Sequence, residues 1–259
     1  MGGSADAELG VQARDGVLWL TIQREERRNA LSHAVLAAMT EAIARASSER
    51  SLRAVVVTGA GSKAFCAGAD LQSAQAFTLD YSEPYGHMAQ LLRAAKACNL
   101  PLVARVNGAC MAGGMGLLAM CDMAVAATHA VFGLPEVKVG VFPAQVLSVL
   151  QHLVPKRRLA EMCITGEPVT SQQALEWGLV NYVDDDVDAR LDWLLARIAD
   201  KSPAAIRRGL YTMKRIESMS FEESMSFTES QIALLTLTDD AKEGQLAFQQ
   251  KRPPKWNGP

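Results

Sequence analysis

The sequence lacks the features that mark several large classes of protein. Its five cysteines are odd in number and show no C-x-x-C or Cys/His ligand spacing: Cys66, Cys98, Cys110, Cys121 and Cys163. We therefore expect no disulfide framework and no metal site, and a cytoplasmic location. The first ten residues have neither the basic nor the apolar region of a signal peptide. The longest apolar run, 109–121, is broken by glycines and is too short to span a bilayer, so no membrane contact is expected.

An excess of charge of one sign is also missing. The chain has 26 Lys and Arg against 28 Asp and Glu, a net charge of −2. No overall field would attract nucleic acid or an anionic membrane, and neither is expected as a partner. Any phosphate-bearing ligand would need local basic residues. With 49% hydrophobic and 21% charged residues, the 259-residue chain has the composition of a soluble globular protein with a large core.

What is present is an α/β pattern. Alternating strand and helix signals run through about the first 140 residues, and helical periodicity dominates afterwards apart from a short strand expected at 178–183. A hairpin is expected around Asp15-Gly16, and Ser32 is expected to cap a helix. Other strands are expected at 52–58, 102–106, 123–127 and 131–132, and helices at 84–98 and from about Val187, Pro203 and Phe221.

Two loops rich in small residues, 65–71 and 107–116, are candidates for binding an anion through backbone N–H groups. Small side chains let a ligand approach the backbone, and N–H groups at a helix start have no intrahelical partner. Two such loops on successive strand–helix units can aim one N–H each at the same oxygen. For the first loop, a tight turn in which Asp70 caps a helix beginning at Leu71 is an equal alternative.

Glu136 is a lone acid in an apolar segment. If it is buried, its neighbours would raise its pKa, which suits a general acid or base near neutral pH. The alternative is a solvated acid, or one paired with Lys138 or Arg105.

In combination these motifs resemble the crotonase (enoyl-CoA hydratase/isomerase) superfamily. Segment 65–71 matches the family's first oxyanion loop, 107–116 with Cys121-Asp122 matches the second, and 132–136 matches the segment that carries the acid. The resemblance extends from Arg27 through 239–244, nearly the whole chain.

The resemblance implies an α/β fold, with a crotonase-like spiral of ββα units over residues 1–195. A helical C-terminal region, 196–259, would build homotrimers or hexamers and close the CoA site. The implied substrate is an acyl-CoA thioester, with CoA present as part of the substrate and no separate cofactor. Its carbonyl would be held by the N–H groups of Ala69 and Gly113, with Glu136 as the general acid/base.

The same resemblance suggests residues that contact CoA. The loop containing Ala67, Asp70 and Leu71 would lie near its adenine end. Arg27 and Lys251, the latter from a neighbouring helix or subunit, would lie near its phosphates. Both basic residues are equally compatible with ordinary solvated positions.

The chain departs from the family pattern at Gly116, where hydratases carry a second glutamate that helps Glu136 hold the attacking water. Segment 142–145 supplies no substitute carboxylate. One carboxylate suffices for a 3-enoyl to 2-enoyl-CoA isomerase. The equal alternative is an atypical hydratase of branched glutaconyl-type esters, in which Gln145, a backbone carbonyl or the substrate's own carboxylate assists the water. A non-catalytic CoA-binding or interaction protein is the alternative outside the enzyme class.

The remaining candidates are weaker. The expected acyl pocket contains Gly116, Gln145, Phe77 and Tyr81. Cys66 and Cys110 are expected to be small buried fillers. Four histidines show no spacing that pairs them: His33, His87, His129 and His152.

Overall fold

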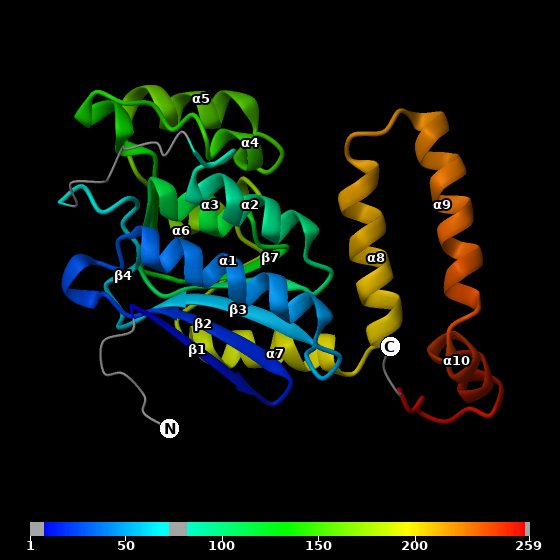
Figure 1. Ribbon diagram of the computed structural model, residues 1–259. Helices are drawn as coiled ribbons and strands as arrows, with labels where there is room; N and C mark the ends of the chain where they lie inside the picture. Colours follow the sequence, from blue (N-terminus) through cyan, green and yellow to red (C-terminus); the bar gives the residue numbers. More distant parts are fainter. Residues whose placement is uncertain (1–7, 73–81, 257–259) are drawn as a thin grey trace.

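The computed structural model describes residues 8–72 and 82–256. Phe77 and Tyr81, two of the expected acyl-pocket residues, lie outside the described residues. Figure 1 shows an α/β core with a set of C-terminal helices standing beside it.

The larger of two sheets has six strands in the order β1-β2-β3-β5-β7-β10. The first two form the expected antiparallel hairpin around Asp15 and Gly16, which both have positive φ, and the other pairings are parallel. The strands are β1 (Leu9–Arg14), β2 (Val17–Ile22), β3 (Ala54–Gly59), β5 (Leu102–Val106), β7 (Met123–Ala127) and β10 (Tyr182–Asp184).

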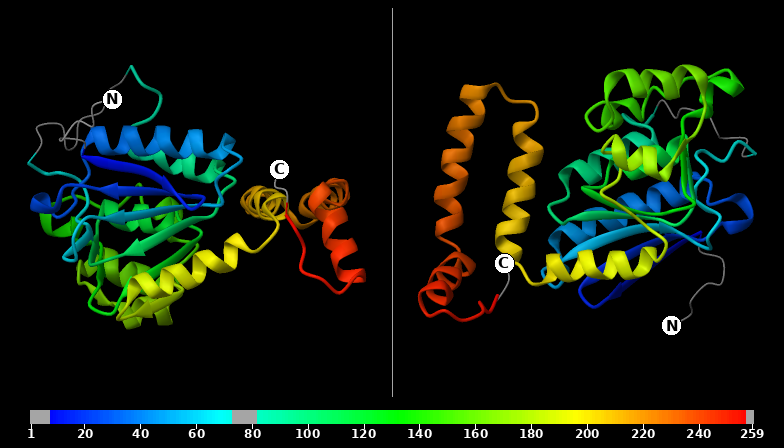
Figure 2. Two further views of the ribbon diagram at one scale, coloured as in Figure 1. Left: turned by 90° about the horizontal axis from the view of Figure 1, so that it is seen from below. Right: turned by 180° about the vertical axis from the view of Figure 1, so that it is seen from behind.

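Helices cover both faces of this sheet (Figures 1 and 2). α1 (His33–Ser48), capped by Ser32 as expected, and α2 (His87–Ala97) lie on one face, and α7 (Val187–Ala199) lies on the other. β3 is buried along its whole length, and its residues alternate between the two core clusters. This explains its continuous apolar run, because a parallel strand covered on both faces has no solvent side.

The smaller sheet has four strands in the order β4-β6-β8-β9. They are β4 (Ala64–Cys66), β6 (Ala109–Met111), β8 (Val131–Gly133) and β9 (Val169–Thr170). Successive turns of the chain supply one strand to each sheet: β3 then β4, β5 then β6, β7 then β8. The expected spiral of ββα units is therefore confirmed.

Short helices lie in the connections between the strands and the longer helices. They are η1 (Glu25–Arg27), α3 (Gly113–Ala119), η2 (Pro135–Val139), α4 (Leu147–Leu150), α5 (Lys156–Thr165) and α6 (Ser171–Glu176).

The C-terminal helices α8 (Pro203–Ile216), α9 (Phe221–Thr236) and α10 (Asp239–Gln249) stand beside the core in all three views (Figures 1 and 2). The expected boundary between residues 195 and 196 falls inside α7, whose Ile198 still packs in the core cluster on the sheet.

Three local expectations differ from the structure. The strand expected at 178–183 is limited to 182–184, because 178–181 forms the turn that leaves α6. The helix expected from Pro84 begins at His87. No helix begins at Leu71 among the described residues, since 71–72 is a turn; the Asp70 carboxylate accepts from Gln72 N, as in a capped turn, and from Arg24.

Candidate active site

Three loops of the candidate site meet at one edge of the small sheet. β4, β6 and β8 are parallel neighbours whose register places Cys66 beside Cys110 and Cys110 beside Phe132. The carboxyl ends of parallel strands lie at the same edge, where ligands of open α/β sheets bind. Ala69, Gly113 and Glu136 each follow this row by three or four residues, so the fold brings the three sequence motifs together.

The backbone N–H groups of Ala69 and Gly113, the two expected oxyanion donors, are available to a ligand. Leu31 forms a bridge with Ala69, in which Leu31 N donates to Gly68 O (2.7 Å) and Asp70 N donates to Leu31 O (3.1 Å). The N–H of Ala69 itself therefore points away from Leu31. Gly113 is the first residue of α3. Neither N–H has a hydrogen-bond partner within the described part of the chain.

The two donor loops are in contact because of Gly68. It has φ +96°, and a Cβ there would lie 2.6 Å from Ala112 Cβ and 3.1 Å from Gly113 N. Only glycine accommodates both the backbone angle and the close approach. Ala112 has φ +51° with ψ −121°, a strained conformation for a residue with a side chain. The strained residue is therefore the N-cap of α3, directly before the N–H of Gly113.

Glu136 lies in η2 and has the environment expected of a proton carrier. It is half-buried, and its Oε2 is a buried atom with no hydrogen-bond partner among the described residues. Burial raises the pKa of its carboxyl group, and a backbone hydrogen bond partly opposes this. The alternative ion pairs are wrong, since Lys138 pairs with Glu167 (2.8 Å) and Arg105 pairs with Asp188 (2.6 Å).

A backbone hydrogen bond ties the acid loop to the second donor loop. Ala112 N donates to Gly133 O (2.9 Å). Gly133 lies three residues before Glu136, and Ala112 immediately precedes Gly113. This hydrogen bond holds the segment that leads to Glu136 against the residue that precedes Gly113.

The space beside Gly116 is filled by an apolar side chain. Gly116 is buried in α3, and a Cβ there would lie only 2.8 Å from Val146 Cγ1. Met88 also approaches, with its Sδ 3.8 Å from the same point. Val146 therefore occupies the space that a side chain at position 116 would enter, a contact that no local sequence pattern predicts. Gln145 is exposed and lines a groove of about 930 Å³ between α2, α4 and α8.

The residues expected to contact CoA have mixed environments. Arg27 is exposed and its guanidinium donates to Gln72 Oε1. Asp70 is buried and forms an ion pair with Arg24 (2.7 Å), which lowers the pKa of its carboxyl group. Leu71 is 54% exposed.

Ala67 and Lys251 are the two remaining residues that are expected to contact CoA. Ala67 is half-buried and donates its N–H to Arg28 O (3.1 Å). Lys251 follows α10, which lies on the far side of the core from β4 in Figure 1. Lys251 is therefore not brought to the site of its own chain.

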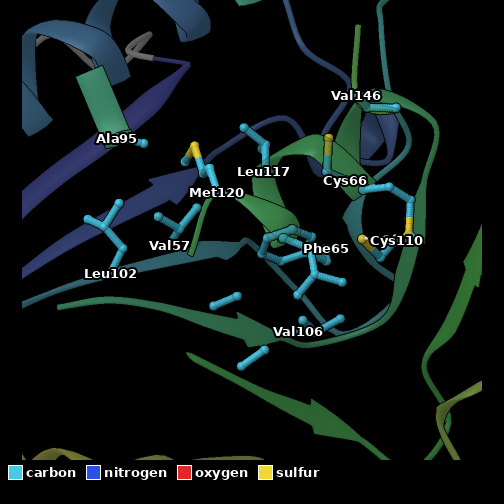
Figure 3. Close-up of a cluster of buried hydrophobic side chains, with 14 of the residues drawn as sticks. Val57, Phe65, Cys66, Ala95, Leu102, Val106, Cys110, Leu117, Met120 and Val146 are labelled. Carbon is cyan, nitrogen blue, oxygen red and sulfur yellow. Dashed lines mark hydrogen bonds between the residues drawn. The ribbon is translucent and has the colours of Figure 1, made fainter. Parts of the chain in front are cut away.

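Cys66 and Cys110 are buried fillers, as expected. Figure 3 shows them with Phe65 and Val146 in the buried cluster. Burial raises the pKa of Cys66 to about 12 and that of Cys110 well above its ordinary value. Both thiols stay protonated at neutral pH and are poor nucleophiles.

The sequence pattern did not predict one contact near the site, between two histidines. His33 and His87, which are 54 positions apart in the sequence, have ring centroids 4.6 Å apart. The only shared signal is that each opens a helix, which sequence spacing alone does not connect.

Two observations concern other functions. In residues 8–72 and 82–256, no three His, Cys, Asp or Glu side chains are grouped so that they could hold a metal ion. Over the same residues, no helix is both long enough and apolar enough to cross a membrane.

Comparison with known proteins identifies the family. Residues 12–259 match the family model described as enoyl-CoA hydratase/isomerase. The 2,3-dehydroadipyl-CoA hydratase of Escherichia coli is 34% identical, covering 97% of this chain and 99% of the relative. The (E)-benzylidenesuccinyl-CoA hydratase of Thauera aromatica is 30% identical over 96% of this chain and 98% of its own.

A solved structure supports the same family assignment. The crystal structure of an enoyl-CoA hydratase from Mycobacterium smegmatis has a TM-score of 0.91 at 33% identity and covers 97% of this chain and 99% of its own. The chain belongs to the enoyl-CoA hydratase/isomerase family, the crotonase superfamily, and is an enzyme that processes acyl-CoA esters.

Proposed function

We propose that the protein hydrates a 2-enoyl-CoA ester at the edge of the small sheet, with Glu136 as its acid/base and the N–H groups of Ala69 and Gly113 as its oxyanion hole. One observation carries this proposal. A buried carboxylate oxygen and two N–H groups, all without a hydrogen-bond partner in residues 8–72 and 82–256, follow three neighbouring parallel strands. CoA enters as part of the substrate, and no separate cofactor is needed.

A single carboxylate can carry out both proton transfers of the hydration. Glu136 takes a proton from water as the water oxygen bonds to C3, and the electrons of the double bond move to the thioester oxygen. The N–H groups of Ala69 and Gly113 stabilise that enolate oxygen. Glu136 then returns the proton to C2, and the 3-hydroxyacyl ester is complete. The relatives named as hydratases favour this reaction over others of the family.

Double-bond migration is the second candidate, and the packing at Gly116 favours it. Val146 occupies the place where a second acid would help to orient water. In the isomerisation Glu136 takes a proton from C2 of a 3-enoyl ester and returns it to C4, so no bound water is required. The same oxyanion hole would hold the dienolate.

The C-terminal helices support a homotrimeric or hexameric assembly. Their large hydrophobic side chains are unusually exposed, with Phe221 at 72%, Leu237 at 69% and Phe248 at 86%. Apolar surface of this extent on a helical unit is typical of a subunit interface. A neighbouring subunit could then supply Lys251 to the CoA phosphates, together with Arg27. The five free thiols fit a cytoplasmic location.

The test is to offer 2-enoyl-CoA and 3-enoyl-CoA esters and to follow water addition and double-bond migration separately. Glu136→Gln should lower the kcat of either activity roughly 10²–10⁴-fold. Glu161→Gln, at an exposed position in α5, is the matched control and should leave both rates unchanged. Unchanged turnover in Glu136→Gln would refute the mechanism.

A further inference from the structure

Two histidines that have no role in the proposed reaction lie at the N-termini of two helices. His33 is the first residue of α1 and His87 the first residue of α2. Their ring centroids are 4.6 Å apart with the planes tilted by 48°. Both side chains are half-buried, and Nδ1 of His87 is a buried atom without a hydrogen-bond partner in the described part of the chain. A buried ring nitrogen without a partner is costly unless a ligand supplies one.

The pair is directly linked to the oxyanion loops. Leu31, two residues before His33, forms the bridge with Ala69, and its Cδ1 lies 3.3 Å from the place of a Cβ on Gly113. Met88, next to His87, has its Cε 3.4 Å from the same place. Leu31 and Met88, which lie close to the two histidines in the sequence, therefore line the position where the thioester would be held.

The surroundings favour an anion. Neither α1 nor α2 has an acid in its first turn, so both helix N-termini keep their partial positive charge near the two imidazoles. The carboxylate of Glu8 accepts from the capping hydroxyl of Ser32 and pairs with Arg24 (2.9 Å). Among the described residues, no carboxylate hydrogen-bonds to either imidazole.

We propose that His33 and His87 bind a carboxylate carried by the acyl group of the CoA ester. This rests on the proposed function, because it assumes that the thioester lies at Ala69 and Gly113. Two ring N–H donors and two helix N-termini match the two oxygens of a carboxylate better than a single neutral hydroxyl. The phosphates of CoA are unsuitable occupants, since the long pantetheine arm separates them from the thioester.

The test compares the binding of two saturated esters that the enzyme cannot turn over. Adipyl-CoA and hexanoyl-CoA have the same six-carbon acyl chain, and only adipyl-CoA has a free carboxylate. Calorimetric titration of the wild-type protein should give at least roughly tenfold tighter binding of adipyl-CoA. His87→Phe and His33→Phe, which retain an aromatic ring without N–H donors, should each reduce this preference at least threefold. His152→Ala, at an exposed position in the groove beside α4, is the control and should keep it.

Each outcome decides the inference. Equal affinity of the wild-type protein for the two esters overturns it, and so does a preference that survives in both phenylalanine variants. If one variant fails to fold by circular dichroism, the other variant and the wild-type comparison still decide. A carboxylate preference without turnover of any enoyl ester would contradict the proposed function and leave the histidine subsite supported.

Discussion

At the scale of single residues, the environment of Glu136 determines how activity depends on pH. Its carboxylate must be ionised to accept a proton, and burial raises its pKa. We expect the acidic limb of the kcat/KM profile to lie at higher pH than for an ordinary glutamate of pKa near 4.3. A profile measured with a 2-enoyl ester between pH 4 and 9 checks this. A limb at or below pH 4.3 would contradict it.

The same shift predicts that the active site reduces stability. A carboxyl group whose folded-state pKa is raised destabilises the fold once it ionises, and the effect is absent below its unfolded pKa. Glu136→Gln cannot ionise. It should therefore unfold at a higher temperature than the wild-type protein above the raised pKa, and the difference should vanish as the pH falls below about 4. Thermal unfolding at several pH values measures this, and a difference that is constant with pH would refute it.

Val146 explains why a simple restoration of the second acid should fail. Glu at position 116 would have its Cβ 2.8 Å from Val146 Cγ1, so Gly116→Glu alone should lose about 1–3 kcal/mol of stability. Combining it with Val146→Ala makes room for the carboxylate. The double variant should hydrate simple 2-enoyl esters faster than Val146→Ala alone. No gain in hydration rate would show that another group already orients the water.

At the scale of elements, the contact between the two donor loops depends on Gly68. Gly68→Ala would force its Cβ against Ala112 and Gly113 N, separating the two N–H donors. Loss of one oxyanion donor reduces kcat roughly 10²–10³-fold, so we expect a loss of that size by steady-state kinetics. Ala112→Gly, which relaxes the positive φ at the adjoining turn, is the control and should retain the fold. Full activity in Gly68→Ala would contradict the assignment of Ala69 and Gly113.

At the scale of the whole molecule, one buried side chain fastens the C-terminal helices to the core. Arg207 of α8 is 9% exposed and donates to Ser47 O (2.9 Å), Asn99 Oδ1 (2.9 Å), Glu49 O (2.5 Å) and Leu52 O (3.2 Å). Ser47 lies in the last turn of α1, Glu49 and Leu52 follow that helix, and Asn99 follows α2, so a single guanidinium links α8 to the ends of both helices.

Removal of this link should disturb the assembly. Arg207→Met leaves four acceptors without their donor, the buried Leu52 O among them, and should cost about 2–4 kcal/mol of stability. It should also reduce the oligomer population measured by light scattering. Arg215→Ala, at an exposed position of the same helix, is the matched control. An unchanged oligomer and melting temperature in Arg207→Met would refute this role.

The sequence by itself determined the strand–helix order, the three motif segments and the family resemblance. Glycines, a helix cap and continuous apolar runs are local signals, and the parallel register then brings Ala69, Gly113 and Glu136 to one sheet edge. Only the tertiary structure decided that Val146 fills the space at Gly116, that Glu136 is free of Lys138 and Arg105, and that His33 meets His87. These contacts join residues far apart in the chain, and they depend on how the helices pack on the sheets rather than on any local pattern.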